Sequence, residues 1–230
     1  PFWKTLIGKL FHKNHVLNLV SKPDLVIGAG HATHASLFLA RLLFGAKQIV
    51  LMKPSLPLFL FDLCLIPEHD GVIKSKRVIM TKGVLNRNKS AEQKKINEGM
   101  ILIGGPSKHY AWDQDQLIKE LGVIISEMPH INWTITDSRR TPDKTVEALK
   151  QLSSEQVSYI SCTETENQWL PDKLADSQYT WVTEDSVSMV YEALTAKNYV
   201  GLLSVPMIQD NRVSKGVRSL VDDGYVVRFA

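Results

Sequence analysis

The sequence has little cysteine. Its 230 residues include only Cys64 and Cys162, which are far apart and form no C-x-x-C pair. A disulfide framework or a cysteine-ligated zinc site needs several closely spaced thiols, so neither is predicted. This use of cysteine fits a reducing compartment, and we expect a cytoplasmic protein.

Long apolar runs are absent as well. The most apolar stretch, residues 49–66, is interrupted by two prolines, by Lys53 and by Asp62. A transmembrane helix needs about 20 predominantly apolar residues, so none is predicted. The net charge of +3 is too small to indicate nucleic-acid binding.

Acidic residues are missing from residues 1–20, which contain lysines and a pattern typical of a basic amphipathic helix. Such a helix either packs on the surface of its own domain or makes peripheral contact with an anionic membrane. Both interpretations stay open at this point.

Short β-branched runs alternate with helical patterns along the chain. Strands are expected at residues 25–27, 48–52, 63–66, 78–80, 100–103, 133–136, 158–161, 180–183, 200–205 and 225–228. Helices are expected at residues 31–44, 113–127, 142–152, 186–195 and 211–222. This alternation, with nearly continuous apolar strands, is typical of parallel sheets covered by helices on both faces. We therefore predict an α/β fold of two Rossmann-like domains.

The alternation weakens over residues 74–97, which are polar and basic. We place a domain boundary there, because few contacts cross polar linkers of this kind. The prediction is an N-terminal Rossmann-like domain over residues 1–96 and a C-terminal one over residues 97–230. The first has few strands for a doubly wound sheet, so we expect it to be incomplete at its N-terminus.

In open parallel sheets, ligands bind outside the carboxyl ends of the strands. The loop after the first expected strand contains Gly28 and Gly30, but Thr33 stands where a dinucleotide fingerprint has its third glycine. A nicotinamide cofactor is therefore not predicted. His31 and His34 are at most half of a metal site, so no metal is expected. His31 is either a polar group facing a ligand or a helix cap.

Ionisable residues also follow the third expected strand. Glu68, His69 and Asp70 could hold a general base, or they could form a solvated turn that closes on Gly71. The two interpretations are equally compatible with the sequence.

In the C-terminal domain, Gly104-Gly105-Pro106-Ser107-Lys108 follows a strand. Its backbone N–H groups and its ammonium group could cradle a phosphate, although the spacing is not that of a Walker motif. A tight turn is the alternative. Arg139 and Arg140 follow the next strand, where arginine forks suit phosphate or carboxylate, or are simply exposed on the surface.

The stretch "TEDSVSMVYEAL", residues 183–194, begins a helix after a strand. Its apolar residues recur at helical spacing, and Asp185 or Ser186 is expected to cap it. Glu192 lies on another face, where its carboxylate can accept hydrogen bonds from a ribose diol. Ser186, Ser188 and the free N–H groups of the first turn can meet a phosphate. Simple capping explains the same residues equally well.

These loops, in their order, resemble the mitochondrial fission (elongated-mitochondria) family of bacteria and plants, which is related to nucleotide-sugar glycosyltransferases. The motifs are "PDLVIGAGHATHAS", "FDLCLIPEHD", "ILIGGPSKHYAWD", "TDSRRTP" and "TEDSVSMVYEA", and they extend over nearly the whole chain. The resemblance implies a fold like that of B-type glycosyltransferases, in which two Rossmann-like domains face a cleft. It also implies that the C-terminal domain holds a nucleoside-diphosphate sugar.

The resemblance further implies roles for individual residues of the donor site. Glu192 would bind the ribose, Asn167 would lie near the base, and the acids of the helix start would cap it or bind sugar hydroxyls. The implied donor-site residues are Gly104, Gly105, Ser107, Lys108, Arg139, Arg140, Asn167, Thr183, Glu184, Asp185, Ser186, Ser188 and Glu192.

The chain departs from the family pattern at four places, and these departures leave the substrate open. His31-Ala32 replaces two basic residues, and Lys53-Pro54-Ser55 replaces Asp-Pro-Arg. Asn167-Gln168-Trp169 replaces Asn-Pro-Tyr, and Ala196-Lys197-Asn198 replaces Gly-Lys-Pro.

The resulting functional prediction is a glycosyltransferase that uses a nucleoside-diphosphate sugar and an unknown glycan or lipid-linked acceptor, without a metal or other cofactor. The acceptor and a general base would lie near the catalytic candidates His31, Glu68 and Asp70. A nucleotide-sugar epimerase would need NAD and usually Tyr-x-x-x-Lys, but no tyrosine here has a lysine four residues later. A non-catalytic, membrane-associated adaptor on the same scaffold is the other alternative.

Overall fold

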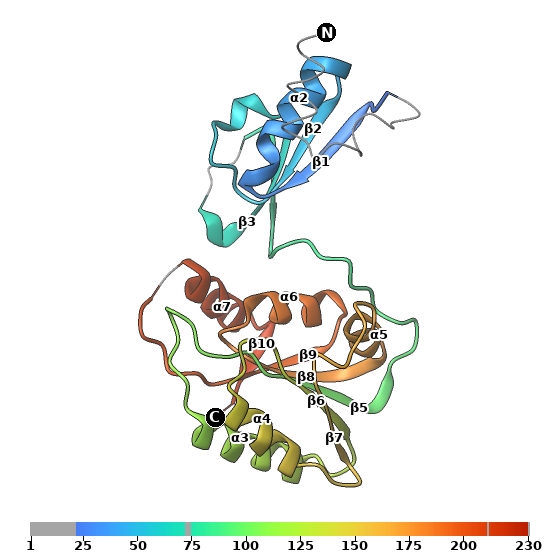
Figure 1. The fold of residues 1–230 in the computed structure, drawn as a ribbon, viewed down its shortest axis with the longest axis vertical. Coiled ribbons are helices and arrows are strands. Elements are labelled where there is room, and N and C mark those ends of the chain that lie inside the picture. The colour runs from blue at the N-terminus through green and yellow to red at the C-terminus, as the bar shows by residue number, and fades with distance from the viewer. Residues whose placement is uncertain (1–21, 72–74, 211, 230) are drawn as a thin grey trace. The chain divides into compact units, whose positions relative to one another are not determined.

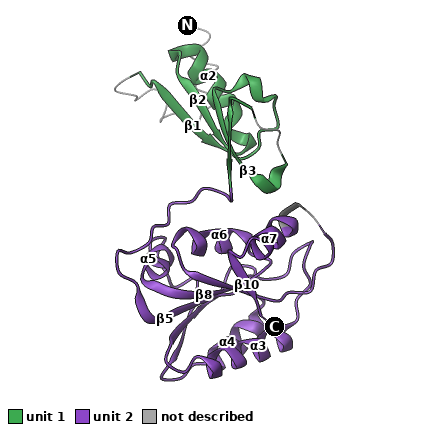
Figure 2. Ribbon diagram, turned by 180° about the vertical axis from the view of Figure 1, so that it is seen from behind, with its two compact units in different colours: residues 1–81 green, residues 82–230 purple. Residues whose placement is uncertain are grey.

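The computed structural model describes residues 22–71, 75–210 and 212–229. The chain divides into two compact units, residues 1–81 and residues 82–230 (Figure 2). The division lies before the expected boundary between residues 96 and 97. Residues 82–94 have the composition of a linker, yet their side chains bond to unit 2, so they belong to that unit.

Unit 1 contains a sheet of four parallel strands in the order β1-β2-β3-β4. The strands are β1 (Leu25–Ala29), β2 (Lys47–Leu51), β3 (Leu63–Pro67) and β4 (Val78–Thr81). A 3-10 turn, η1 (His31–Thr33), and helix α2 (His34–Phe44) connect β1 to β2, whereas short 3-10 turns, η2 (Leu58–Leu60) and η3 (Glu68–Asp70), precede and follow β3. Its core consists of Leu37, Val50, Phe61, Cys64 and Ile66.

Unit 2 contains six parallel strands in the order β7-β6-β5-β8-β9-β10. Counted within the unit, this is the strand order 3-2-1-4-5-6 of the doubly wound Rossmann fold. The strands are β5 (Lys95–Leu102), β6 (Asn132–Thr136), β7 (Val157–Ile160), β8 (Ser177–Thr183), β9 (Tyr199–Leu203) and β10 (Val226–Arg228). The order reverses between β5 and β8, and ligands of this fold bind at that point.

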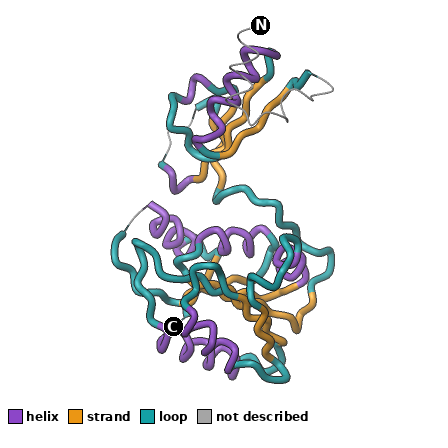
Figure 3. Tube along the Cα trace, viewed as in Figure 1, coloured by secondary structure: helices purple, strands orange, loops and turns teal. Residues whose placement is uncertain are grey.

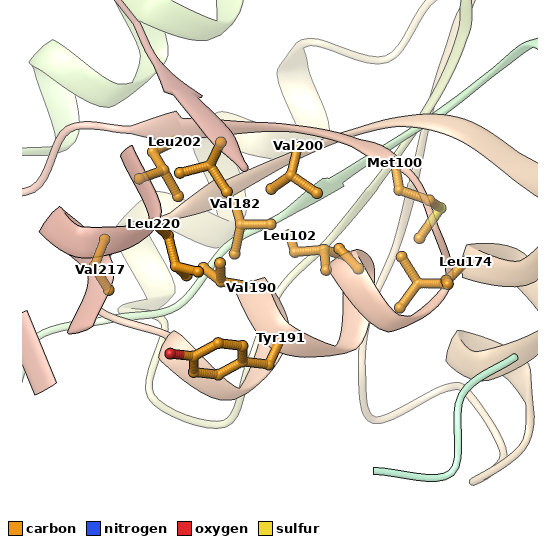
Figure 4. Packing of buried hydrophobic residues seen from close by; sticks show 13 residues of the cluster. Met100, Leu102, Leu174, Val182, Val190, Tyr191, Val200, Leu202, Val217 and Leu220 are labelled. Carbon is orange, nitrogen blue, oxygen red and sulfur yellow. The ribbon is translucent and has the colours of Figure 1, made fainter. Parts of the chain in front are cut away.

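Helices cover both faces of the unit 2 sheet (Figure 1). One face carries α3 (Gln114–Glu127) and α4 (Asp143–Gln151); the other carries α5 (Trp169–Asp176), α6 (Val187–Thr195) and α7 (Arg212–Asp222). Successive side chains of a strand point to opposite faces of the sheet, so β5 contributes to the hydrophobic core on each face. Met100 and Leu102 join the cluster drawn in Figure 4, and Ile101 joins the cluster that contains Leu117 and Leu121 of α3.

The predicted strands all form, and so do the five predicted helices (Figure 3). Their ends shift by up to three residues, except that β5 begins at Lys95, five residues before its predicted start. Helix α5 was not predicted, because it is short and contains Pro171. The proline lies in the first turn, where its missing N–H has no partner within the helix in any case. The predicted amphipathic helix of residues 1–20 lies outside the described residues. In the part of the chain that the structure describes, no helix has the length and apolarity needed to span a bilayer.

Lys94 joins the connecting segment to the end of α5 and to β8. Its Nζ donates to the carbonyl oxygen of Ala175 at 3.1 Å, to that of Ser177 at 2.7 Å and to Oδ1 of Asn198 at 2.6 Å. Burial lowers the pKa of this ammonium group. The neighbouring Lys95 instead forms a 2.8 Å ion pair with Asp176 at the surface.

We expect Lys94→Met to lower the free energy of unfolding of unit 2 by about 2 kcal/mol, because several acceptors lose a charged donor. Lys95→Met is the matched control, since an exposed ion pair contributes at most about 1 kcal/mol. Urea unfolding followed by tryptophan fluorescence measures both, because Trp112, Trp133, Trp169 and Trp181 all lie in unit 2. Equal losses in the two variants would contradict the role of Lys94.

Candidate functional site

The strand order of unit 2 brings the loops after β5 and β8 together. Leu102 of β5 pairs with Val182 of β8, so both strands end at the same edge of the sheet. The N–H of Gly104 then donates to Oγ1 of Thr183 at 2.7 Å inside the protein. These two predicted site residues therefore contact each other, and both are buried.

A carboxylate clamps three loops at this edge. Oδ2 of Asp185 accepts the N–H of Gly105 at 3.0 Å and Nη2 of Arg140 at 2.8 Å. Arg140 also donates from Nη1 to the carbonyl oxygen of Gly105 at 2.7 Å. We call this group the Asp185 clamp. It joins Asp185 after β8, Arg140 after β6 and Gly105 after β5.

The clamp explains the glycine pair. A Cβ atom at position 104 would collide with the carboxylate of Asp185, and one at position 105 would collide with the backbone of Arg140. The N–H groups of Gly104 and Gly105 are already bonded within the protein. Close packing therefore accounts for both glycines, and the role of this loop in phosphate binding stays a prediction.

The start of α6 is not capped by a side chain. Ser186 is the N-cap residue, but it makes no side-chain capping bond, and the recorded bonds of Asp185 go to the clamp. Ser186 therefore occupies the predicted N-cap position, but the predicted capping bond from its side chain or from that of Asp185 does not form. Ser186 is buried, and Ser188 is exposed in the first turn. Oδ1 of Asp185 is buried without a hydrogen-bond partner.

Glu184 is held away from the helix start. Its Oε2 forms a 3.0 Å ion pair with Arg228 of β10, and its Oε1 accepts the N–H of Val205 at 3.4 Å. The two adjacent acids therefore pair with arginines of different segments, and neither caps the helix. The expectation of sugar-hydroxyl binding by these acids stays a prediction.

A pocket of about 880 Å³ opens beside the clamp within unit 2. Three of the predicted site residues line it: Arg139 after β6, Asn167 in the loop after β7, and Glu192 on α6. The lining also includes Asn86, Arg87 and Asn88 from the connecting segment and Trp169 of α5. The sequence does not predict a role for these residues of the connecting segment, because their polar, basic composition is typical of a linker.

Glu192 is the carboxylate of the pocket whose pKa is shifted. Its side chain is half-buried, and it makes no recorded hydrogen bond or ion pair within the described residues. Burial raises the pKa of this carboxyl group. Arg139 is exposed at the same pocket and likewise has no recorded partner in the described part of the chain. A half-buried carboxylate and a guanidinium are thus both available to a ligand.

Ser107 and Lys108 lie outside this pocket lining. The hydroxyl of Ser107 accepts the N–H groups of His109 and Tyr110 at 3.2 and 3.3 Å, so it stabilises its own turn. Lys108 is exposed. Of the predicted donor-site residues, three line the pocket, and Gly104, Gly105, Arg140, Thr183 and Asp185 lie at the clamp.

In unit 1, the catalytic candidates follow parallel strands at one edge of the sheet. His31 and Glu68 are exposed, whereas Asp70 is buried with its Oδ1 4.0 Å from Nε2 of His69. Lys53, which follows β2, donates to the carbonyl oxygen of Asp70 at 2.9 Å. No cluster of three or more potential metal ligands occurs among the residues described.

The Asp185 clamp can be tested by a double-mutant cycle. We expect Asp185→Ala and Arg140→Ala each to destabilise unit 2, with a coupling energy of about 1 kcal/mol, because the partly exposed arginine is screened by solvent. Chemical unfolding of the two single variants and the double variant measures this coupling. Strictly additive effects would show that the two residues do not act as a pair.

The chain is 25% identical over 221 residues to an uncharacterised protein of Rickettsia prowazekii (strain Madrid E), which covers 76% of the chain and 62% of that protein. Among solved structures, it is similar to a protein assigned as a UDP-N-acetylglucosamine 2-epimerase from Listeria monocytogenes. That likeness has a TM-score of 0.57 and 11% identity, and it covers 94% of this chain and 64% of that one.

A second similar structure is that of accessory secretory proteins 1, 2 and 3 in Streptococcus pneumoniae. The TM-score is 0.52 at 10% identity, with 95% of this chain and 50% of that chain covered. Identities this low show the fold alone, and the chain spans less than two thirds of the length of each of these proteins.

The fold predicted from the sequence, two Rossmann-like units of the B-type glycosyltransferase kind, is confirmed. The family model for mitochondrial fission ELM1 matches residues 2–230. Because this match covers almost the whole sequence, the chain belongs to the mitochondrial fission ELM1 family.

Proposed function

We propose that unit 2 binds a nucleoside-diphosphate sugar and that the protein transfers the sugar to a glycan or lipid-linked acceptor. The observation that carries this proposal is Glu192, a half-buried carboxylate with a raised pKa that lines the pocket of about 880 Å³. Partial burial of an ionised carboxylate lowers the stability of the fold, and groups with pKa values shifted in this way are common at functional sites.

The ribose is the part of the donor that suits Glu192. An ionised carboxylate accepts hydrogen bonds through both oxygens, so it can meet the two hydroxyls of a ribose diol. In this proposal Asn167, in the same pocket, lies near the base.

The diphosphate would lie between Arg139 and the start of α6. The first-turn N–H groups of this helix are not capped by a side chain, and a helix N-terminus favours an anion. Ser186 and Ser188 lie at this end of the helix. Arg140 and the N–H of Gly105 are engaged in the clamp, and the N–H of Gly104 donates to Thr183. We therefore propose that these groups shape the site and do not contact the phosphates directly.

Transfer requires a base for the acceptor and stabilisation of the leaving diphosphate. The acceptor oxygen forms a bond to the anomeric carbon while the bond from that carbon to the diphosphate oxygen breaks. The hydroxyl proton passes to a base, for which unit 1 offers the exposed His31 or Glu68 more readily than the buried Asp70. Arg139 and the helix start would stabilise the developing charge, without a metal in this proposal.

An epimerase is the second candidate, because the Listeria structure bears that assignment. The likeness shows only a shared fold, so the two activities are separated by their products. A transferase releases nucleoside diphosphate in proportion to the acceptor that is modified, whereas an epimerase converts the sugar nucleotide without acceptor. The adaptor hypothesis depends on residues 1–20, which lie outside the described residues. Cytoplasmic location with peripheral membrane contact stays a prediction.

The first test measures binding of nucleoside diphosphates and their sugar derivatives by calorimetry and thermal shift. We expect one of them to bind, and Glu192→Gln and Arg139→Gln each to weaken it about tenfold or more. Glu192→Gln should also remove the preference for a ribose over a 2′-deoxyribose nucleotide. Glu147→Gln and Lys144→Gln, exposed on α4, are the matched controls and should bind like the unmodified protein.

Two outcomes would contradict the proposal. If no nucleotide binds the unmodified protein, unit 2 is not a donor site. If binding occurs but ribose preference survives in Glu192→Gln, the carboxylate does not read the diol.

The second test uses the raised pKa of Glu192. Because the folded protein holds a proton there more readily than the unfolded chain, the ionised carboxylate costs stability at neutral pH, and this cost disappears as pH falls through the raised pKa. Glu192→Gln should therefore raise the melting temperature of the unliganded protein at neutral pH, by an amount that shrinks in mildly acidic buffer. A variant that melts lower at neutral pH would assign Glu192 a structural role instead.

A further inference from the structure

The connecting segment before β5 is fastened to α6 by two asparagines. Nδ2 of Asn86 donates to the carbonyl oxygen of Tyr191 at 3.3 Å and to Oγ1 of Thr195 at 2.9 Å. Nδ2 of Asn88 donates to the carbonyl oxygen of Glu192 at 3.3 Å. The backbone of residues 86–88 is thereby held against the C-terminal half of the helix that carries Glu192.

Arg87 lies between these anchors. Oδ1 of Asn86 accepts the N–H of Asn88 at 3.0 Å, which closes an Asx-turn with Arg87 at its centre. The Arg87 side chain is exposed, lines the pocket of about 880 Å³ and has no recorded hydrogen bond or ion pair within the described ranges. A fixed turn therefore presents an available guanidinium to the pocket.

The position of the turn along α6 decides which part of a nucleotide Arg87 can reach. The phosphates are assigned to the start of the helix, at residues 186–188, and the ribose to Glu192. The anchors of the turn lie at Tyr191 and Glu192, level with the ribose position, and at Thr195, one turn further from the phosphates. Asn167 and Gln168 line the same pocket. Arg87 is therefore at the base end.

We propose that Arg87 contacts the base and selects bases with a keto oxygen at C6 of a purine or C4 of a pyrimidine, guanine or uracil, against adenine and cytosine. This inference rests on the proposed function, because it assumes that a nucleotide fills the pocket. The guanidinium has only N–H donors, which suit O6 of guanine or O4 of uracil. Adenine and cytosine carry an amino group at the corresponding position, so donor would face donor.

The test compares UDP, GDP, ADP and CDP by calorimetry with the unmodified protein, Arg87→Gln and Lys89→Gln. The unmodified protein should bind UDP or GDP most tightly, and Arg87→Gln should reduce its preference for that nucleotide over ADP and CDP roughly tenfold. Lys89→Gln is the matched control, because Lys89 is an exposed cation that lines the neighbouring cavity of about 580 Å³ and not the pocket of about 880 Å³. Its preference should be unchanged.

The outcomes separate this inference from the proposed function. If the unmodified protein prefers ADP or CDP, or if Arg87→Gln weakens all four equally or not at all, Arg87 does not read the base while the donor site stands. If none of the four binds, the proposed function fails and this inference fails with it. The unliganded Arg87→Gln protein should melt like the unmodified one, because Arg87 has no recorded partner to lose in the described structure.

Discussion

The Asp185 clamp is the interaction on which the site depends. The sheet of unit 2 reverses its strand order between β5 and β8, which leaves the loops of both strands side by side without a covalent link. Asp185 joins them by accepting from Gly105, and Arg140 adds the loop after β6. The pocket is lined by the loops that follow β6 and β7 and by α6, next to the loop that carries Arg140.

The clamp also determines which charged side chains near the site are paired and which are available to a ligand. Two adjacent arginines follow β6, yet Arg140 is bonded to Asp185 while Arg139 lines the pocket. Three acids accompany α6, and of these Glu184 pairs with Arg228, Asp185 with Arg140, and Glu192 has no recorded partner among the described residues. A cluster that looks too acidic for a phosphate thus contains one available carboxylate, and it lies beyond the helix start.

The connecting segment shows how composition and contacts can disagree. Residues 82–94 are polar and contain no helix or strand, as Figure 3 shows, which is typical of a linker. Lys94 nevertheless bonds to carbonyl oxygens of α5 and β8 and to Asn198 before β9, and Asn86 and Asn88 bond to α6. These hydrogen bonds hold the segment against the rest of unit 2, where its residues 86–88 line one side of the pocket.

The sequence alone determined the strands, most of the helices and the order of the loops. Apolar runs such as residues 100–103 form strands because both faces of the sheet are covered, and the periodicity of residues 187–194 reports one buried helix face. Helix α5 was not predicted because it has only eight residues and contains Pro171, a combination that is also typical of a loop. Tertiary structure alone decided which of two adjacent arginines is available, why Gly104 and Gly105 are glycines, and that Arg87 borders a pocket. These facts depend on partners far apart in the sequence, and a local pattern contains no information about the distance between such partners.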